Sequence, residues 1–175
     1  MDKSYKELFN DVNTFIFDVD GVLTNGIVTV FPNGELVRQM NIKDGYALKA
    51  AVKAGYKVCI ISGGKNEGVR TRLEGLGITD IYLGAHKKID QYNELVEKYN
   101  LQPKNILYMG DDIPDLPVME KVGIPCCPSD AVRELQAISV YISDKKGGEG
   151  CARDVIEQIM RVQEKWHDNF DAKYD

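Results

Sequence analysis

Two carboxylates one residue apart are the first candidates for chemistry in this sequence. Asp18 and Asp20 follow the apolar run TFIF and precede a glycine, Gly21. If the run is a strand and the pattern continues, alternation points both side chains the same way. Two carboxylates this close are costly unless a cation lies between them or one is protonated, and both arrangements are typical of catalytic sites. A strand-end turn with incidental acids is the structural alternative, because Asp and Gly are common turn residues.

A second acidic cluster, GDDIPD (residues 110–115), follows the apolar run NILYM. Magnesium prefers carboxylate oxygens and retains several water ligands, so two acidic strand ends that converge on one crevice predict a Mg²⁺ site. Carboxylates also stabilise a helix N-terminus. We expect the members of this cluster, Asp111, Asp112 and Asp115, to divide these two roles among themselves.

Phosphate-binding features lie between the two acidic clusters. The run KVCII ends in Ser62, Gly63 and Gly64, whose hydroxyl and backbone N–H groups can hold phosphoryl oxygens. Lys87 and Lys88 begin a predicted helix, where a cation opposes the helix dipole and therefore indicates an anion nearby. Each signal is weak when taken alone.

Short apolar runs alternate with amphipathic stretches along most of the chain. This alternation predicts an α/β fold, a doubly wound, Rossmann-like parallel sheet whose strands are covered on both faces. An antiparallel hairpin at about 26–41, GIVTVF-PNGE-LVRQMN, interrupts the pattern directly after the first strand. We expect one domain over 1–175, with the hairpin beside the ligand site and a C-terminal tail and helix at about 147–168.

Composition restricts the partners. A net charge of -5 and a pI near 5.1 argue against nucleic acid, which needs clustered Lys and Arg, and favour a small molecule. No run approaches the roughly 18 apolar residues of a membrane span, so no membrane partner is expected. The 4 cysteines lack C-x-x-C spacing and the N-terminus lacks an apolar signal core, which predicts reduced cysteines and a cytoplasmic protein.

The order of these motifs is more specific than any one of them. The series D-x-D-G-x-L-T, strand-end Ser, helix-start Lys and G-D-D-x-x-D resembles the haloacid dehalogenase superfamily of phosphatases over about residues 14–155. The resemblance implies that Asp18 is the nucleophile and Asp20 the general acid and base, with Ser62 and Lys88 as phosphate ligands. It implies that Asp18, Asp111 and the backbone carbonyl of Asp20 bind Mg²⁺, which leaves Asp112 and Asp115 in supporting positions.

The spacing leaves little room for a cap domain. A hairpin, a helix and a strand already fill the stretch from Asp18 to Ser62, and the stretch from Ser62 to Lys88 is shorter still. The chain therefore resembles the capless branch, and within it the acidic-sugar phosphatases of lipopolysaccharide biosynthesis, which cleave esters such as 3-deoxy-D-manno-octulosonate (KDO) 8-phosphate. The hairpin, the segments NIKDG (41–45) and GDDxxDxPVM and the tail GGEGCARD (147–154) carry this likeness.

Three departures from the branch leave the chemistry intact but blur the choice of sugar. Gly64 stands where Arg or Glu is frequent, and Cys151 and Asp154 stand where Ala and Glu are frequent.

A sugar acid carries a carboxylate, so its pocket needs cations beyond Lys88. Candidates are Lys43, Arg70, Arg72 and Arg153. Arg70 and Arg72 lie two residues apart on a predicted helix and face different directions, so at most one of them should face the pocket. A solvated surface is equally compatible with each, because most surface charges only solvate.

The hairpin also bears on assembly. Its alternating pattern leaves an apolar face exposed on a lone protomer, which predicts a homo-oligomer. The resemblance implies a homotetramer in which hairpins pack together and the glycine-rich segment 147–153 enters the adjacent active site. A flexible linker before the last helix is the alternative, since glycine suits that role as well.

Other functions fit less completely. A 9-phosphate phosphatase for a nonulosonic acid would have the same chemistry. A phospho-accepting receiver domain has a similar sheet, but it gathers its acid pair and its acceptor Asp on different strands. A non-catalytic interaction domain is disfavoured because every expected catalytic residue is present.

Overall fold

A six-stranded parallel sheet forms the centre of the protein in the computed structural model, which describes residues 4–167. Its strand order is β5-β4-β1-β6-β7-β8. The strands are β1 (Thr14–Phe17), β4 (Lys57–Ile61), β5 (Asp80–Tyr82), β6 (Ile106–Met109), β7 (Ile124–Cys127) and β8 (Tyr141–Ile142). Every neighbouring pair is parallel, so the predicted doubly wound α/β fold is confirmed.

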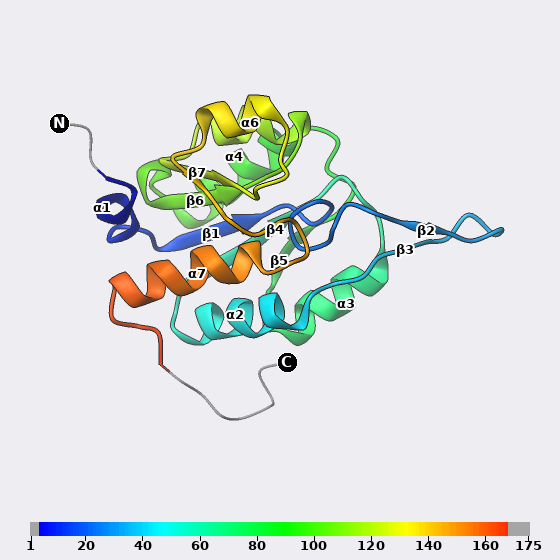
Figure 1. The fold of residues 1–175 in the computed structure, drawn as a ribbon, viewed down its shortest axis with the longest axis horizontal. Helices are drawn as coiled ribbons and strands as arrows, with labels where there is room; N and C mark the ends of the chain where they lie inside the picture. The colour runs from blue at the N-terminus through cyan, green and yellow to red at the C-terminus, as the bar shows by residue number, and fades with distance from the viewer. Residues whose placement is uncertain (1–3, 168–175) are drawn as a thin grey trace.

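Helices cover both faces of the sheet (Figure 1). One layer holds α2 (Ile42–Lys53), α3 (Glu67–Gly75) and α7 (Cys151–Val162), and the other holds α4 (Lys88–Tyr99), α5 (Leu116–Met119) and α6 (Arg133–Ile138). The short α1 (Tyr5–Phe9) packs its Phe9 into the first layer. Two 3₁₀ turns, η1 (Pro103–Asn105) and η2 (Ile113–Asp115), flank β6. None of the helices within residues 4–167 has the length and apolar character to span a bilayer.

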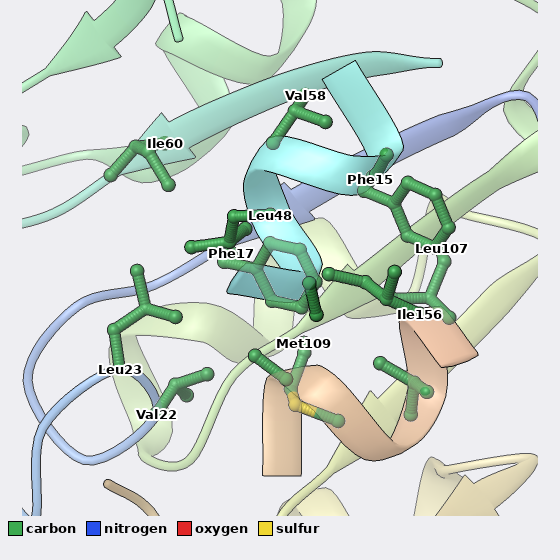
Figure 2. Packing of buried hydrophobic residues seen from close by; sticks show 14 of the residues in the cluster. Phe15, Phe17, Val22, Leu23, Leu48, Val58, Ile60, Leu107, Met109 and Ile156 are labelled. Carbon is green, nitrogen blue, oxygen red and sulfur yellow. The ribbon is translucent and has the colours of Figure 1, made fainter. Parts of the chain in front are cut away.

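Strand alternation divides the core between the two layers. Phe15 and Phe17 of β1 face α2 and α7, whereas Ile16 faces the opposite layer, and all three are fully buried. Figure 2 shows Phe17 beside Leu48 of α2, with Ile156 of α7 close by. Burial of each such side chain contributes about 1.5–3 kcal/mol, so the sheet is a firm base for the loops at its edges.

The hairpin projects away from this body (Figure 1). Its paired strands, β2 (Thr29–Val30) and β3 (Leu36–Val37), have only 2 residues each, fewer than the alternating runs in the sequence suggest. Within residues 4–167, the two strands of the hairpin remain exposed, and Ile27 and Val30 are 69% and 67% exposed.

The chain order places a ligand site. From β1 the chain passes to β4 and β5 on one side, and it then crosses back to β6 on the other side of β1. In open parallel sheets, ligands bind outside the carboxyl ends of the strands at such a reversal. Here Asp18 directly follows β1, and Asp111 lies two residues beyond β6.

Candidate active site

A cleft of about 430 Å³ opens at this reversal. Its walls come from the loops after β1, β4, β5 and β6, and they are acidic on one side and rich in glycine on the other. The lining residues are Asp18, Asp20, Gly26, Ser62, Gly63, Gly64, Ala85, His86, Lys88, Asp111, Asp112, Pro114 and Asp115. The structure therefore brings together Asp18, Asp20, Ser62, Gly63, Lys88 and the three aspartates of 110–115.

A tight turn after β1 fixes Asp18. The Asp18 N–H donates to Met109 O of β6 at 3.1 Å, and the Val19 N–H donates to Asp18 Oδ1 at 2.7 Å. Gly21 adopts φ +87°, and a Cβ there would lie 1.9 Å from Asp111 Oδ2. Glycine is thus required at this position both by the backbone conformation and by the approach of Asp111 to the loop.

Lys88 joins the two acidic clusters. Its ammonium lies 2.9 Å from Asp18 Oδ2 and 2.7 Å from Asp115 Oδ1, and all three side chains are buried. Asp115 also accepts hydrogen bonds from the Tyr108 hydroxyl and from the Asp111 N–H. Asp115 therefore holds both Lys88 and the 110–115 loop in place through hydrogen bonds. Its position near a predicted helix start did not indicate this role.

Asp112 fills the helix-capping role. Its side chain accepts from the Ile113 N–H at 2.8 Å at the start of η2, and Asp115 completes a capping box with it.

On the acidic side of the cleft, two carboxyl groups have raised pKa values. Burial, reinforced by the charge of Asp115 and opposed by Lys88, raises the pKa of Asp18 to about 8. Burial, again with Asp115, raises the pKa of Asp111 to about 7. A bound divalent cation would favour the ionised form of both carboxylates.

The geometry fits such a cation. Oxygens of Asp18, Asp111 and Asp115 lie within 4.8 Å of one another, and carboxylate oxygens are the donors that Mg²⁺ prefers. Both Asp115 oxygens already accept two hydrogen bonds each, whereas each Asp18 oxygen accepts one, so Asp18 and Asp111 are the better placed to hold the ion.

The opposite wall is suited to a phosphate. Ser62 is buried directly after β4, and its hydroxyl accepts the Gly64 N–H at 3.3 Å. Gly63 is exposed and has open space where a Cβ would lie, so an anion can approach its backbone. Helix α3 begins only at Glu67, so these groups stand on a loop and not on the helix terminus expected from the sequence.

Asp20 has a partner that the sequence did not indicate. Arg38, just beyond β3, donates from Nε to Asp20 Oδ1 at 2.6 Å and from Nη2 to Asp20 Oδ2 at 2.9 Å. The Asp20 hydrogen bond raises the pKa of the guanidinium further. A cation at the base of a hairpin was the available signal, but nothing in the spacing showed which carboxylate it meets.

Within residues 4–167, none of the four candidate sugar-binding cations lines the cleft of its own protomer. Lys43 and Arg153 line a separate cavity of about 400 Å³ beside α2 and α7. Arg72 lines a groove of about 570 Å³ between the hairpin and α3. Arg70 donates to Glu67 and to Ile81 O.

The glycine-rich segment before α7 is bound to its own chain. The Gly148 N–H donates to Val22 O at 2.9 Å, and Gly148 O accepts from Asn41. A Cβ on Gly147 would lie 2.0 Å from Gly21 O. These contacts of Gly147 and Gly148 are made with the loop that follows Asp20 in the same chain, and the entry of 147–153 into a neighbouring protomer's active site stays a prediction.

The last helix is shorter than expected. Helix α7 ends at Val162, and residue 168, the expected end of this element, lies outside the described residues.

Comparison with known proteins shows the family of this chain. Residues 27–123 match the haloacid dehalogenase-like hydrolase family. The 3-deoxy-D-manno-octulosonate 8-phosphate phosphatase KdsC of Escherichia coli K12 is 37% identical over 155 residues, which cover 89% of this chain and 82% of that protein.

Solved structures agree as well. The phosphatase of the same name from Yersinia pestis superposes with a TM-score of 0.89 at 33% identity, covering 91% of this chain and 86% of the other. That from Moraxella catarrhalis, solved with magnesium, phosphate and KDO, gives 0.87 at 30% identity and 91% coverage of both. The chain belongs to the haloacid dehalogenase-like hydrolases, as its motif order predicted.

Proposed function

We propose that this protein is a Mg²⁺-dependent phosphatase that hydrolyses KDO 8-phosphate to KDO and phosphate. The observation that carries the proposal is the cleft in which Asp18, Lys88 and Asp111 meet opposite Ser62 and Gly63. The choice of substrate rests on the relatives that share this fold, because those reported above are phosphatases of this one sugar acid.

The first step transfers the phosphoryl group to Asp18. A carboxylate oxygen of Asp18 attacks phosphorus in line while the bond to the sugar oxygen breaks, which leaves an aspartyl-phosphate. Lys88 and the Ser62–Gly63 loop hold the phosphoryl oxygens and offset the repulsion between two anions. Asp18, Asp111 and the Asp20 carbonyl would hold Mg²⁺, which would further neutralise this charge.

Asp20 serves both halves of the reaction. In the first step the Asp20 carboxyl group, once protonated from solvent, donates that proton to the departing sugar oxygen. In the second it accepts a proton from water, which then attacks phosphorus and releases Asp18. Asp20 is suited to this because it lines the same cleft and its side chain is 34% exposed, so water can reach it.

Self-association would complete the sugar site. Within residues 4–167, Lys88 is the only Lys or Arg that lines the cleft, whereas Lys43, Arg70, Arg72 and Arg153 lie outside it. We propose a homotetramer built on the exposed hairpins, in which one protomer's cations face a neighbour's cleft. We also place the enzyme in the cytoplasm, where the 4 buried free cysteines would remain reduced.

The test is phosphate release from KDO 8-phosphate with Mg²⁺, with EDTA and after Mg²⁺ is restored. We expect turnover with the metal, loss on chelation and recovery on addition. The Asp111→Ala variant should require a higher Mg²⁺ concentration for half-maximal rate. A receiver domain would release no phosphate, so absence of turnover would overturn the proposal, and an unchanged activation constant would remove Asp111 from the metal site.

A further inference from the structure

The strongest feature that the proposed chemistry leaves unused is the pair formed by Arg38 and Asp20. The guanidinium makes two parallel hydrogen bonds to the carboxylate, at 2.6 and 2.9 Å. Such bidentate pairing fixes both the position and the plane of a carboxylate, which a lysine cannot do.

Arg38 is itself held in place. Its Nη1 donates to Leu36 O at 3.1 Å, and its side chain is only 8% exposed although it comes from a projecting hairpin. Gly64 borders the pair from the other side, where a Cβ would lie 3.1 Å from both Arg38 Nη2 and Asp20 Oδ2. The absence of a side chain at position 64 therefore leaves the space that the pair occupies.

Arg38 does not line the catalytic cleft; it lines the neighbouring groove between the hairpin and α3. A direct contact with the phosphate would require it to leave Asp20. Among residues 4–167, the Arg38 side chain hydrogen-bonds to Asp20 and to Leu36 O of its own hairpin, so its effect on the reaction would pass through Asp20.

We propose that Arg38 is a positioning residue that holds the Asp20 carboxyl group in line with the sugar oxygen. This inference rests on the proposed role of Asp20 as general acid and base. The base of the hairpin is then part of the catalytic apparatus, because it carries Arg38, which sets the orientation of the Asp20 carboxyl group.

The test uses leaving groups of different quality. Sugar and simple alkyl phosphates need a proton on the departing oxygen, whereas 4-nitrophenyl phosphate scarcely does. The main variant is Arg38→Met, which keeps an unbranched aliphatic side chain but removes the guanidinium group. Arg38→Lys is the rescue variant. The matched control is Lys104→Ala, which removes an exposed cation in η1, at the amino end of β6 and therefore opposite the cleft.

For Arg38→Met we expect kcat/KM to fall about 100-fold on KDO 8-phosphate and on a simple alkyl phosphate, and less than about 10-fold on 4-nitrophenyl phosphate, because kcat/KM reports the steps up to departure of the leaving group and not the hydrolysis that all esters share. KM should change less than kcat. Arg38→Lys should recover part of the loss on the alkyl esters, and Lys104→Ala should match the wild type throughout.

Three results would overturn the inference. Equal losses of kcat/KM on all esters together with a lower Tm would show a merely structural role. A raised KM for KDO 8-phosphate with unchanged kcat would show a substrate-binding role, and unchanged kinetics would show none. The outcome is separable from the proposed function: if wild type ignores KDO 8-phosphate, the alkyl and aryl esters still reveal whether Arg38 acts through Asp20.

Discussion

At the scale of single residues, the site depends on charges that burial makes costly and that neighbours offset. Asp18 and Asp111 lie close together at two strand ends, and Lys88 lies between Asp18 and Asp115. Each buried carboxylate alone would cost free energy, because burial removes the water that stabilises its charge. The cluster is therefore suited to binding a cation and a phosphate together, which is what phosphoryl transfer needs.

Replacing the nucleophile should separate chemistry from folding. For Asp18→Asn we expect kcat to fall roughly 10⁴-fold or more, because the amide cannot attack phosphorus. The change keeps the side-chain volume and removes a buried charge, so Tm should not drop by more than a few degrees. Phosphate release and a thermal melt on the same sample check this, and near-normal turnover would exclude Asp18 as nucleophile.

Asp44 gives a pH dependence away from the metal site. Burial raises the pKa of this carboxyl to about 6, although it accepts backbone N–H groups at the start of α7. Among residues 4–167, its buried Oδ2 has no hydrogen-bond partner. Since its folded pKa is the higher one, Asp44 costs nothing below about pH 4, and stability falls as pH rises through about 6. The expected loss is about 3 kcal/mol.

Urea unfolding of wild type and Asp44→Asn between pH 4 and 7 isolates this effect. Asparagine retains a carbonyl for the Arg153 N–H, so the variant differs mainly in lacking the titration. We expect the wild-type free energy of unfolding to decline relative to the variant as pH rises. A constant difference over this range would show that Asp44 does not titrate as described.

At the scale of elements, the segment 147–150 packs against the loop that carries Asp20. Gly147 and Gly148 lie so close to the backbone of residues 21–25, which directly follow Asp20, that a Cβ on either would clash with it. For Gly147→Ala we expect at least a 10-fold loss of kcat and a lower Tm, because the new Cβ would push Gly21 away from its position.

Gly75→Ala is the matched control for this change. Gly75 lies in α3 with open space around its Cβ position, and alanine there should leave kcat unchanged and slightly raise Tm. If both variants keep wild-type kcat, the segment has no influence on the active loop.

The sequence could predict the parts of the site that strands position. Asp18 and Asp111 sit just beyond apolar runs, and parallel strands end at one edge, so their convergence follows from periodicity alone. The pairing of Arg38 with Asp20 depends on how far a hairpin folds back, which no local pattern determines. The buried position of Asp115 was equally hidden, because an acid near a helix start also suits an exposed cap.

At the scale of the whole molecule, the exposed hairpin is the feature that a lone protomer does not explain. Val30 is 67% exposed, with Ile27 and Phe31 also open to solvent. For Val30→Glu we expect the assembly to dissociate toward protomers in sedimentation, because a charge would be buried between apolar arms. Asn33→Asp, which adds a charge at the polar tip of the same hairpin, should leave the mass unchanged.

Dissociation should also weaken binding of the sugar acid if neighbouring cations complete the cleft. KM for KDO 8-phosphate should rise in Val30→Glu, while the rate on 4-nitrophenyl phosphate stays nearly constant. A wild-type protein that sediments as a fully active protomer would contradict this account of assembly.

The choice of substrate is tested most directly by kcat/KM with Mg²⁺ on three esters. These are KDO 8-phosphate, a nonulosonic acid 9-phosphate and a hexose 6-phosphate, which share the leaving-group chemistry but differ in chain length and in the carboxylate. We predict that KDO 8-phosphate exceeds the nonulosonate ester at least 10-fold and the hexose ester by about 100-fold or more, since loss of a paired charge costs several kcal/mol. Equal values for KDO 8-phosphate and the hexose ester, or a preference for the nine-carbon ester, would contradict the assignment.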